Sequence, residues 1–230
     1  MIQQTESNLV SGFSQDSAGD YIIHLDCGHR QHVRHSPPWQ ERSFVIDGAS
    51  RRARIGTTWD CPWCSGLRTG EAPVGPLELK NLEVEDDWID YNGHMNVAWY
   101  VLAFDRGVDV LLDEIGVGKI YLEQRHASMF TLEINVHYLA EAHRQDPLRL
   151  CGQLLAADNK RIHFFLYMYH AADGHLLATL EQVALHVDMQ QRRSAPFPDD
   201  IKSRLDDLIQ HHRRLDRPEQ LSGCMGLKSR

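Results

Sequence analysis

The chain has 230 residues, of which 42% are hydrophobic and 24% are charged, and its formal net charge is −8. This length is enough for one domain of ordinary size and a second, small one. The stretch 71–198 carries a net charge of −9, which opposes binding to polyanionic nucleic acid. Residues 1–20 lack the basic and apolar segments of a signal peptide, and no later apolar run could span a bilayer. We therefore expect a cytoplasmic globular protein that binds neither nucleic acid nor membranes.

The N-terminal part of the chain, 1–66, is expected to form a small β-rich domain. Weak alternation of apolar and polar residues predicts short strands at 21–25, 43–46 and 55–59. Glycines and prolines then interrupt any periodicity, so 67–76 is expected to be a linker.

Cysteine and histidine residues gather in this small domain. The chain has five cysteines, an odd number, which favours metal binding over disulfides. Cys61 and Cys64 form a C-x2-C pair, whose thiolates can turn toward one metal ion. Cys27 and one histidine would complete a tetrahedral zinc site, and the alternatives for that histidine are His29, His32 and His35. A lone cysteine is usually a buried apolar residue and a lone histidine a surface group, but their convergence favours zinc. Because four protein ligands leave no open position, such a zinc ion is expected to stabilise the fold.

Residues 11–66 resemble a small bacterial domain family of unknown function. The shared residues read LDCGH, QHVRH and PPW, and the match ends at the C-x2-C pair. The resemblance adds weight to the zinc site but implies no activity.

The second domain is expected over 77–198 and begins with a strand at 77–84. From Val97 onward, apolar residues recur at steps of three and four, which is typical of the buried face of a helix. Asn96 suits the N-cap of this helix and Gly116 suits its C-terminal cap. The helix is expected to be about 20 residues, or about 30 Å, long.

Four strands are predicted after the helix. They are expected at 130–138, 148–155, 162–169 and 176–188. The first shows strict alternation of apolar and polar residues, and Asp-Asn and Asp-Gly turn signals join the last three. A strand, one long helix and an antiparallel meander occur in this order in the α+β hot-dog fold, where the sheet wraps around the helix. One helix leaves a sheet edge and a face uncovered, so we expect a homodimer or homotetramer.

The last segment, 199–230, is predicted to hold a charged amphipathic helix followed by a polar tail. The helix is expected where apolar residues recur within DDIKSRLDDLIQHHRRL. The tail is expected to be disordered, because it is polar and lacks periodicity.

A motif at the start of the long helix carries the functional prediction. Asp90 begins the string D-x-x-G-H-M-N, and Tyr100 follows ten residues later. This pattern resembles that of the 4-hydroxybenzoyl-CoA thioesterase-like group of hot-dog enzymes. The resemblance implies hydrolysis of an acyl-CoA thioester without a cofactor. It implies that Asp90 is the nucleophile or general base, that the N–H groups of Asn96 and Val97 bind the oxyanion, and that His94 positions substrate or water. Helix N-termini suit this role, because their N–H groups are unpaired and their dipole end is positive.

Each residue of the motif also fits an ordinary structural role. Asp90 followed by a glycine is common turn chemistry, and Tyr100 suits a core position. His94 could equally hydrogen-bond the loop. The complete motif, placed just before a buried helix, favours the catalytic interpretation.

The stretch from 83 to about 200 also resembles thioesterases of carnitine catabolism, through IDYNGHMNVAWYVLAFDRG, FTLEINVHYLAE, DNKRIHFFLYMYHA and ATLEQVALHVD. This similarity implies a small cationic acyl group such as betainyl. Aromatic rings could bind its trimethylammonium head by cation–π contact. The candidates for substrate contact, each of which alone would also suit the core, are Trp88, Trp99, Tyr100, Phe130 and Tyr138.

Two alternative functions belong to other classes. A hydratase of the same fold would carry the string D-x-N-P-x-H, which is absent from the sequence. A non-catalytic acyl-CoA sensor, with the metal domain as its protein-contact surface, stays open. Release of free thiol from acyl-CoA would separate an enzyme from a sensor.

Overall fold

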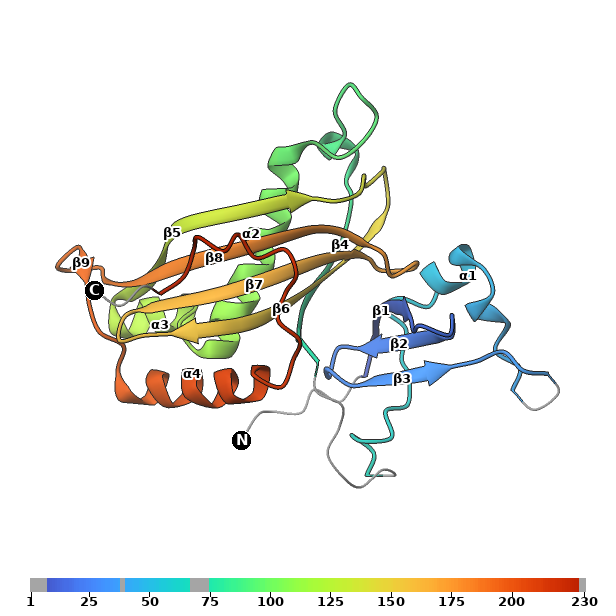
Figure 1. Ribbon diagram of the computed structural model, residues 1–230, viewed down its shortest axis with the longest axis horizontal. Helices are drawn as coiled ribbons and strands as arrows, with labels where there is room; N and C mark the ends of the chain where they lie inside the picture. Colours follow the sequence, from blue (N-terminus) through green and yellow to red (C-terminus); the bar gives the residue numbers. More distant parts are fainter. Residues whose placement is uncertain (1–7, 38–39, 67–74, 228–230) are drawn as a thin grey trace.

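The computed structural model describes residues 8–37, 40–66 and 75–227. Two β-sheets, one small and one large, lie in separate parts of the molecule along its long axis (Figure 1). The small sheet has the antiparallel order β1-β2-β3, with strands at Val10–Gln15, Tyr21–Leu25 and Arg30–Val33. Its core is buried and includes Phe13, Ile23 and Leu25.

Only one of the three strands predicted in this part is present, the one at Tyr21–Leu25. In place of the strand predicted at 43–46, Ser43–Val45 forms a 3-10 helix that leads into helix α1 (Gly48–Arg52). The physical reason is Asp47, whose carboxylate accepts the N–H of Ser50 at 2.9 Å and so caps a helix. Residues 55–59 contribute an isolated bridge, between Thr58 and Leu9.

The large sheet confirms the predicted meander. Its order is β4-β6-β7-β8-β5, all neighbours are antiparallel, and a short β9 (Arg193–Ser194) pairs with β8. The five long strands are β4 (Leu77–Glu83), β5 (Ala127–Tyr138), β6 (Pro147–Ala157), β7 (Arg161–His170) and β8 (Leu176–Asp188).

Helix α2 (Val97–Ile115) packs against one face of this sheet, as the hot-dog arrangement requires. The Asn96 side chain caps it, and Gly116 ends it with φ of 87°, a conformation that glycine adopts at little cost. The buried side of α2 includes Phe104 and Leu111, both fully buried. A short helix that was not predicted, α3 (Lys119–Arg125), follows.

The C-terminal segment packs on the sheet in two parts. Helix α4 (Asp199–His212) packs against β6 and contacts α2, and its buried apolar residues join the core beneath α2. Residues 213–227 then cross in front of the sheet, over the face that α2 leaves open (Figure 1). The backbone N–H of Ser222 donates to the buried carboxylate of Glu181 at 2.7 Å. The tail therefore lies on the sheet over these residues, where disorder was expected.

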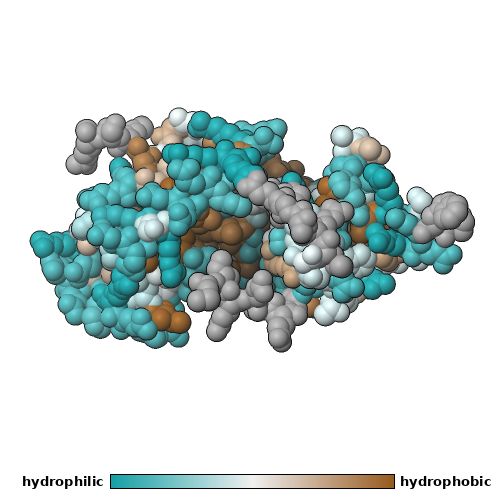
Figure 2. Space-filling view, turned by 90° about the horizontal axis from the view of Figure 1, so that it is seen from below, coloured by the Kyte–Doolittle hydropathy of each residue, from teal (hydrophilic) through white to brown (hydrophobic). Residues whose placement is uncertain are grey.

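The surface is mostly hydrophilic on the face drawn in Figure 2, with hydrophobic residues gathered in a hollow near its middle. Among the residues that the structure describes, no helix is long and apolar enough to cross a membrane.

Candidate active site and metal site

A tight loop carries Asp90 to the beginning of α2. The Asp90 carbonyl accepts the N–H of Gly93 and the Asp90 N–H donates to the carbonyl of His94, both at 3.0 Å. Gly93 has φ of 90°, which favours glycine in the turn. One carboxylate oxygen of Asp90 accepts the N–H of Asn92 at 2.7 Å. The loop thus orients the carboxylate, and its second oxygen accepts no hydrogen bond from the described part of the chain.

The two arms of this loop lie side by side. Ile89 pairs with Met95, and the N–H of Asn96 donates to the carbonyl of Trp88 at 2.9 Å. Because that N–H is already engaged, Asn96 does not offer the free oxyanion donor that was predicted for it. Its side chain instead accepts the N–H of Ala98 at 3.0 Å and caps the helix. Val97 begins α2, so its own N–H has no acceptor within the helix and is the remaining candidate donor.

His94 lies on the same loop but faces a neighbouring segment. Its Nε2 is 3.5 Å from a carboxylate oxygen of Glu141, and about a third of the His94 side chain is exposed. Glu141 belongs to the segment 139–146, which joins β5 to β6. This position suits His94 for holding the loop or for contacting a substrate at the surface.

The predicted aromatic residues fall into two pairs and one separate residue. Trp99 stacks on Trp88, with ring centroids 5.4 Å apart. Tyr100 meets the edge of Tyr138 at 5.3 Å. Both pairs include a residue from the first turn of α2. Phe130 is eight residues from Tyr138 along β5, or about 26 Å at ~3.3 Å per residue, so the structure does not bring Phe130 to these pairs within one chain.

An acidic cavity beside α2 was not predicted. It has a volume of about 490 Å³ and lies between the second half of α2, α3 and the strands β5 and β8. Asp105, Asp109 and Asp113 line it from successive turns of α2. Burial, together with repulsion from the two other aspartates, raises the pKa of the Asp109 carboxyl. Their spacing of four residues was visible in the sequence, but the cavity depends on how β5 closes over the helix.

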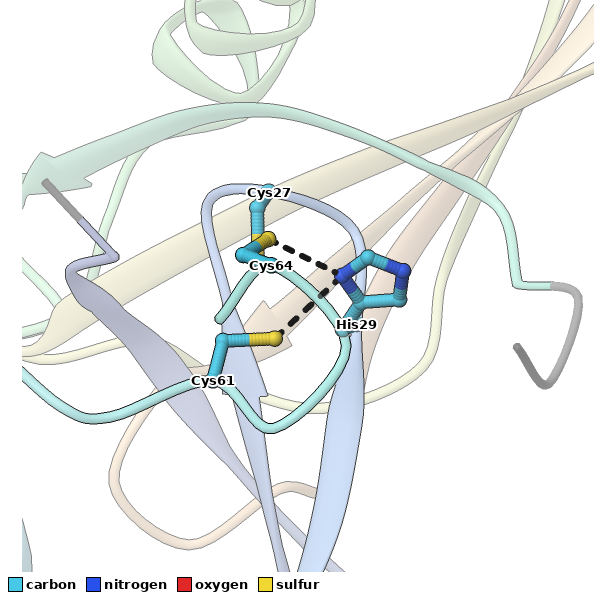
Figure 3. A group of neighbouring side chains, drawn as sticks. All are labelled: Cys27, His29, Cys61 and Cys64. Atoms are coloured by element: carbon cyan, nitrogen blue, oxygen red, sulfur yellow. Dashed lines mark hydrogen bonds between the residues drawn. The ribbon is translucent and has the colours of Figure 1, made fainter. Parts of the chain in front are cut away.

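The predicted metal ligands meet in the small domain. Cys27, His29, Cys61 and Cys64 each offer one ligand atom, and these atoms all lie within 4.8 Å of one another (Figure 3). His29 Nδ1 is 3.4 Å from the Cys61 sulfur and 3.5 Å from the Cys64 sulfur. Burial, with a contribution from the neighbouring thiols, raises the pKa of the Cys27 thiol to about 12. A cation would be needed to hold these thiols as thiolates, and three sulfurs with one imidazole fit a tetrahedral ion.

Among the three alternative histidines, the structure selects His29 and places the others elsewhere. His32 Nε2 lies 3.0 Å from a carboxylate oxygen of Asp16, so His32 is not part of the metal cluster. His35 Nδ1 accepts the N–H of Arg42 at 3.0 Å. The reason is that His32 lies in strand β3 with its side chain exposed, whereas His29 lies in the turn before that strand, next to Cys27.

Comparison with known families identifies the large domain. Residues 84–205 match the model of the Thioesterase-like superfamily. The chain belongs to this superfamily. Residues 11–67 match a second model, described as a protein of unknown function, DUF3565. The second match covers the Cys/His cluster and gives it no role.

Relatives of the thioesterase-like domain carry related names. A betainyl-CoA thioesterase of Pseudomonas aeruginosa is 35% identical over 161 residues, which are 70% of this chain and 95% of the relative. An L-carnitine dehydrogenase/betainyl-CoA thioesterase of Rhizobium meliloti is 40% identical over 154 residues. The matched region covers 67% of this chain but only 31% of that fusion protein.

A solved structure supports the same fold for the thioesterase-like domain. A hypothetical protein of Staphylococcus aureus in complex with CoA is 26% identical, with a TM-score of 0.61. The match covers 69% of this chain and all of that one. The hot-dog fold expected from the sequence is therefore confirmed.

Proposed function

We propose that this protein hydrolyses acyl-CoA thioesters and that Asp90 carries the reaction. The observation that supports this most directly is the tight loop that carries Asp90 immediately before the N-terminus of α2, in a domain of the thioesterase-like superfamily. The named activity of the relatives supports the same reaction class.

Two chemical routes are open to Asp90. As a general base, the carboxylate takes a proton from water while the water oxygen bonds to the thioester carbon. As a nucleophile, its oxygen bonds to that carbon, and water later cleaves the resulting anhydride. In both routes the carbon–sulfur bond breaks, CoA leaves as a thiolate that takes up a proton, and the carboxylic acid is released. The N–H of Val97 and the positive end of α2 would stabilise the oxyanion.

For the acyl group we propose a small cationic one, with betainyl as the leading candidate. The names of the relatives support this, and so does the acidic cavity lined by Asp105, Asp109 and Asp113. Asp105 is eight residues beyond Val97, or about 12 Å along the helix, which exceeds the reach of a betainyl group bound at Val97. These aspartates would therefore attract the cationic acyl group through their electrostatic field, or contact a substrate that is bound at the active site of the second chain of a dimer.

We further propose a homodimer or homotetramer that uses strand β5. This strand is at the end of the sheet, so one edge has no strand neighbour among the described residues. Its large apolar side chains are between 41% and 53% exposed, namely Phe130, Leu132, Ile134 and Tyr138. An open apolar edge invites pairing with a second copy. Pairing through β5 would also bring the partner's residues toward the surface around Tyr138.

For the small domain we propose a structural zinc ion held by Cys27, His29, Cys61 and Cys64. Zinc would replace the hydrogen bonds among these side chains by metal bonds and join the β2–β3 turn to the segment after α1. The thiols of Cys151 and Cys224 are also unpaired. Unpaired thiols fit a reducing compartment, and the cytoplasm is the proposed location.

The test of this function is thiol release from a panel of acyl-CoA esters. We expect betainyl-CoA to be cleaved with a larger kcat/KM than a neutral acyl-CoA of equal size. Asp109→Asn should reduce that preference while leaving the neutral substrate nearly unaffected. Binding of acyl-CoA without thiol release would instead support the sensor.

A further inference from the structure

The segment 139–146, which joins β5 to β6, holds the beginning of α2 in place. The N–H of Met95 donates to the carbonyl of Ala142 at 2.8 Å. The Tyr100 hydroxyl accepts the N–H of Ala142 at 3.0 Å and donates to the carbonyl of Ala140 at 3.2 Å. Met95 and Tyr100 lie on either side of the helix N-cap. The position of this segment therefore helps to set the position of the α2 N-terminus and of the Asp90 loop that is joined to it.

The other end of the same segment is held by the small domain. Arg52 Nη1 donates to the carbonyl of Gln145 at 2.8 Å, and Arg52 Nη2 lies 3.3 Å from the Asp146 carboxylate. Gln145 has φ of 62°, the left-handed region that non-glycine residues adopt only when their surroundings hold them there. The backbone N–H of Gln145 donates to the carbonyl of Val84, and its backbone carbonyl accepts from Arg52, so both backbone polar groups of Gln145 are held.

Arg52 is itself fixed by its neighbour in α1. Arg51 is buried, and its guanidinium donates to the carbonyl of Ala172 at 2.8 Å and to the Asp173 carboxylate at 2.9 Å. The same guanidinium lies 4.2 Å from the centre of the Tyr21 ring. Ala172 and Asp173 belong to the β7–β8 turn of the thioesterase-like domain. Arg51 thus anchors α1 to that domain and presents Arg52 to the segment 139–146.

The two domains also fit closely around this anchor. The N–H of Phe13 donates to the carbonyl of Ala171 at 2.7 Å. A Cβ atom on Gly174 would lie 2.5 Å from the Phe13 carbonyl oxygen. Such close backbone contact leaves α1 little freedom to shift against the thioesterase-like domain.

We propose that the Cys/His domain supports the active site, with Arg52 as a positioning residue that acts through the segment 139–146. The expected effect on kcat rests on the proposed thioesterase function. The connection from Arg52 to α2 through the segment 139–146 rests only on the contacts described above. Among the described residues, Arg52 forms hydrogen bonds and an ion pair with Gln145 and Asp146, and none with Asp90 or α2. Its side chain is 42% exposed, so its ion pair contributes little to overall stability. Its main effect is therefore expected on the position of the Asp90 loop and the N-terminus of α2, and so on the rate of the reaction.

The test compares Arg52→Ala, Arg52→Lys and a control, Arg34→Ala, in the full chain. Arg34 is an exposed arginine of the same domain whose partner, Asp20, also lies in that domain. We expect Arg52→Ala to lower kcat about tenfold with little change in KM, because small displacements of catalytic groups cost rate and not binding. Arg52→Lys should recover part of the loss, because its ammonium can still donate to the Gln145 carbonyl. Arg34→Ala should match the wild type.

Hydrogen exchange gives a readout that does not depend on activity. The N–H of Met95 should exchange faster in Arg52→Ala than in the wild type, while amides in β7 and β8 remain unchanged. If Arg52→Ala matches Arg34→Ala in both kcat and exchange at Met95, the proposal is wrong. If the wild-type protein releases no thiol from any acyl-CoA, the proposed function fails, and exchange at Met95 alone then decides whether Arg52 holds the segment.

Discussion

The Tyr100 hydroxyl accepts a hydrogen bond from the backbone N–H of Ala142, 3.0 Å away, although the two residues are 42 positions apart in the chain. Ala142 is fully buried, so no solvent can replace this bond. Tyr100, a candidate for substrate contact by its place in the motif, thus has its polar atom committed to the backbone of the segment 139–146. Its ring can still meet a substrate through the contact with Tyr138.

Tyr100→Phe is accordingly expected to lower both stability and activity. The substitution leaves the buried N–H of Ala142 without its partner, which costs about 1–3 kcal/mol of unfolding free energy. Urea unfolding measures that cost and thiol release measures kcat. Tyr121→Phe is a matched control, because it removes a buried hydrogen bond between the Tyr121 hydroxyl and His186, away from the segment 139–146. Equal kcat in the two variants would contradict a link between Tyr100 and the active site.

Metal binding by the small domain is expected to require its cysteines. The purified protein should contain one zinc ion per chain by metal analysis, and Cys61→Ser should lose it and lower Tm. Cys224→Ser replaces an exposed thiol outside the cluster and should change neither quantity. A wild-type protein without metal, or full zinc content in Cys61→Ser, would refute the site.

Self-association through β5 is expected to be sensitive to charge on that strand. Ile134 is 42% exposed and pairs with Gln182 on the neighbouring strand. Ile134→Lys should shift the protein to a monomer in light scattering, because a charge on an edge strand opposes pairing. Ile120→Lys changes an equally apolar but more exposed residue on α3 and should leave the mass unchanged. A monomeric wild type, or an unchanged mass for Ile134→Lys, would contradict the proposed interface.

Stability is expected to fall as the pH is lowered below about 6.5. Burial, assisted by repulsion from His211, lowers the pKa of His212 to about 4, and its Nδ1 accepts the N–H of Leu154 at 2.8 Å. As the pH falls through about 6.5, His212 takes up a proton in the unfolded chain but not in the folded one. The free energy of unfolding therefore decreases progressively from pH 6.5 down to about 4. At pH 5 the loss is about 2 kcal/mol. His212→Gln should show a shallower decline of Tm from pH 7 to 5, and an identical decline would rule out this cause.

The sequence predicted the large domain well, because its signals are local and repeated. The apolar steps of α2, its Asn96 cap and the alternation of β5 each depend on residues close in the chain. The misses arise from contacts that leave no periodic pattern in the sequence. The N–H of Asn96 donates to the carbonyl of Trp88 on the other arm of the same loop. The C-terminal tail is held by Glu181, 41 residues before Ser222.

The choice between His29 and His32 illustrates the same limit in the small domain. Both are close to Cys27 in sequence, and spacing alone could not decide between them. The turn before β3 directs His29 toward the cysteines, while pairing of β3 with β2 exposes His32. Sequence patterns therefore identified the kind of site, and the strand pairing determined its members.

The measurement that tests the central claim most directly is thiol release from acyl-CoA by Asp90→Asn. This substitution keeps the shape of the side chain and an oxygen that can accept the N–H of Asn92, but it removes the base and nucleophile. Circular dichroism and light scattering should match the wild type. We expect kcat to fall by about 10²–10⁴ if Asp90 is a general base, and further if it is the nucleophile. A folded Asp90→Asn variant that keeps more than about a third of the wild-type kcat would show that another group performs the reaction.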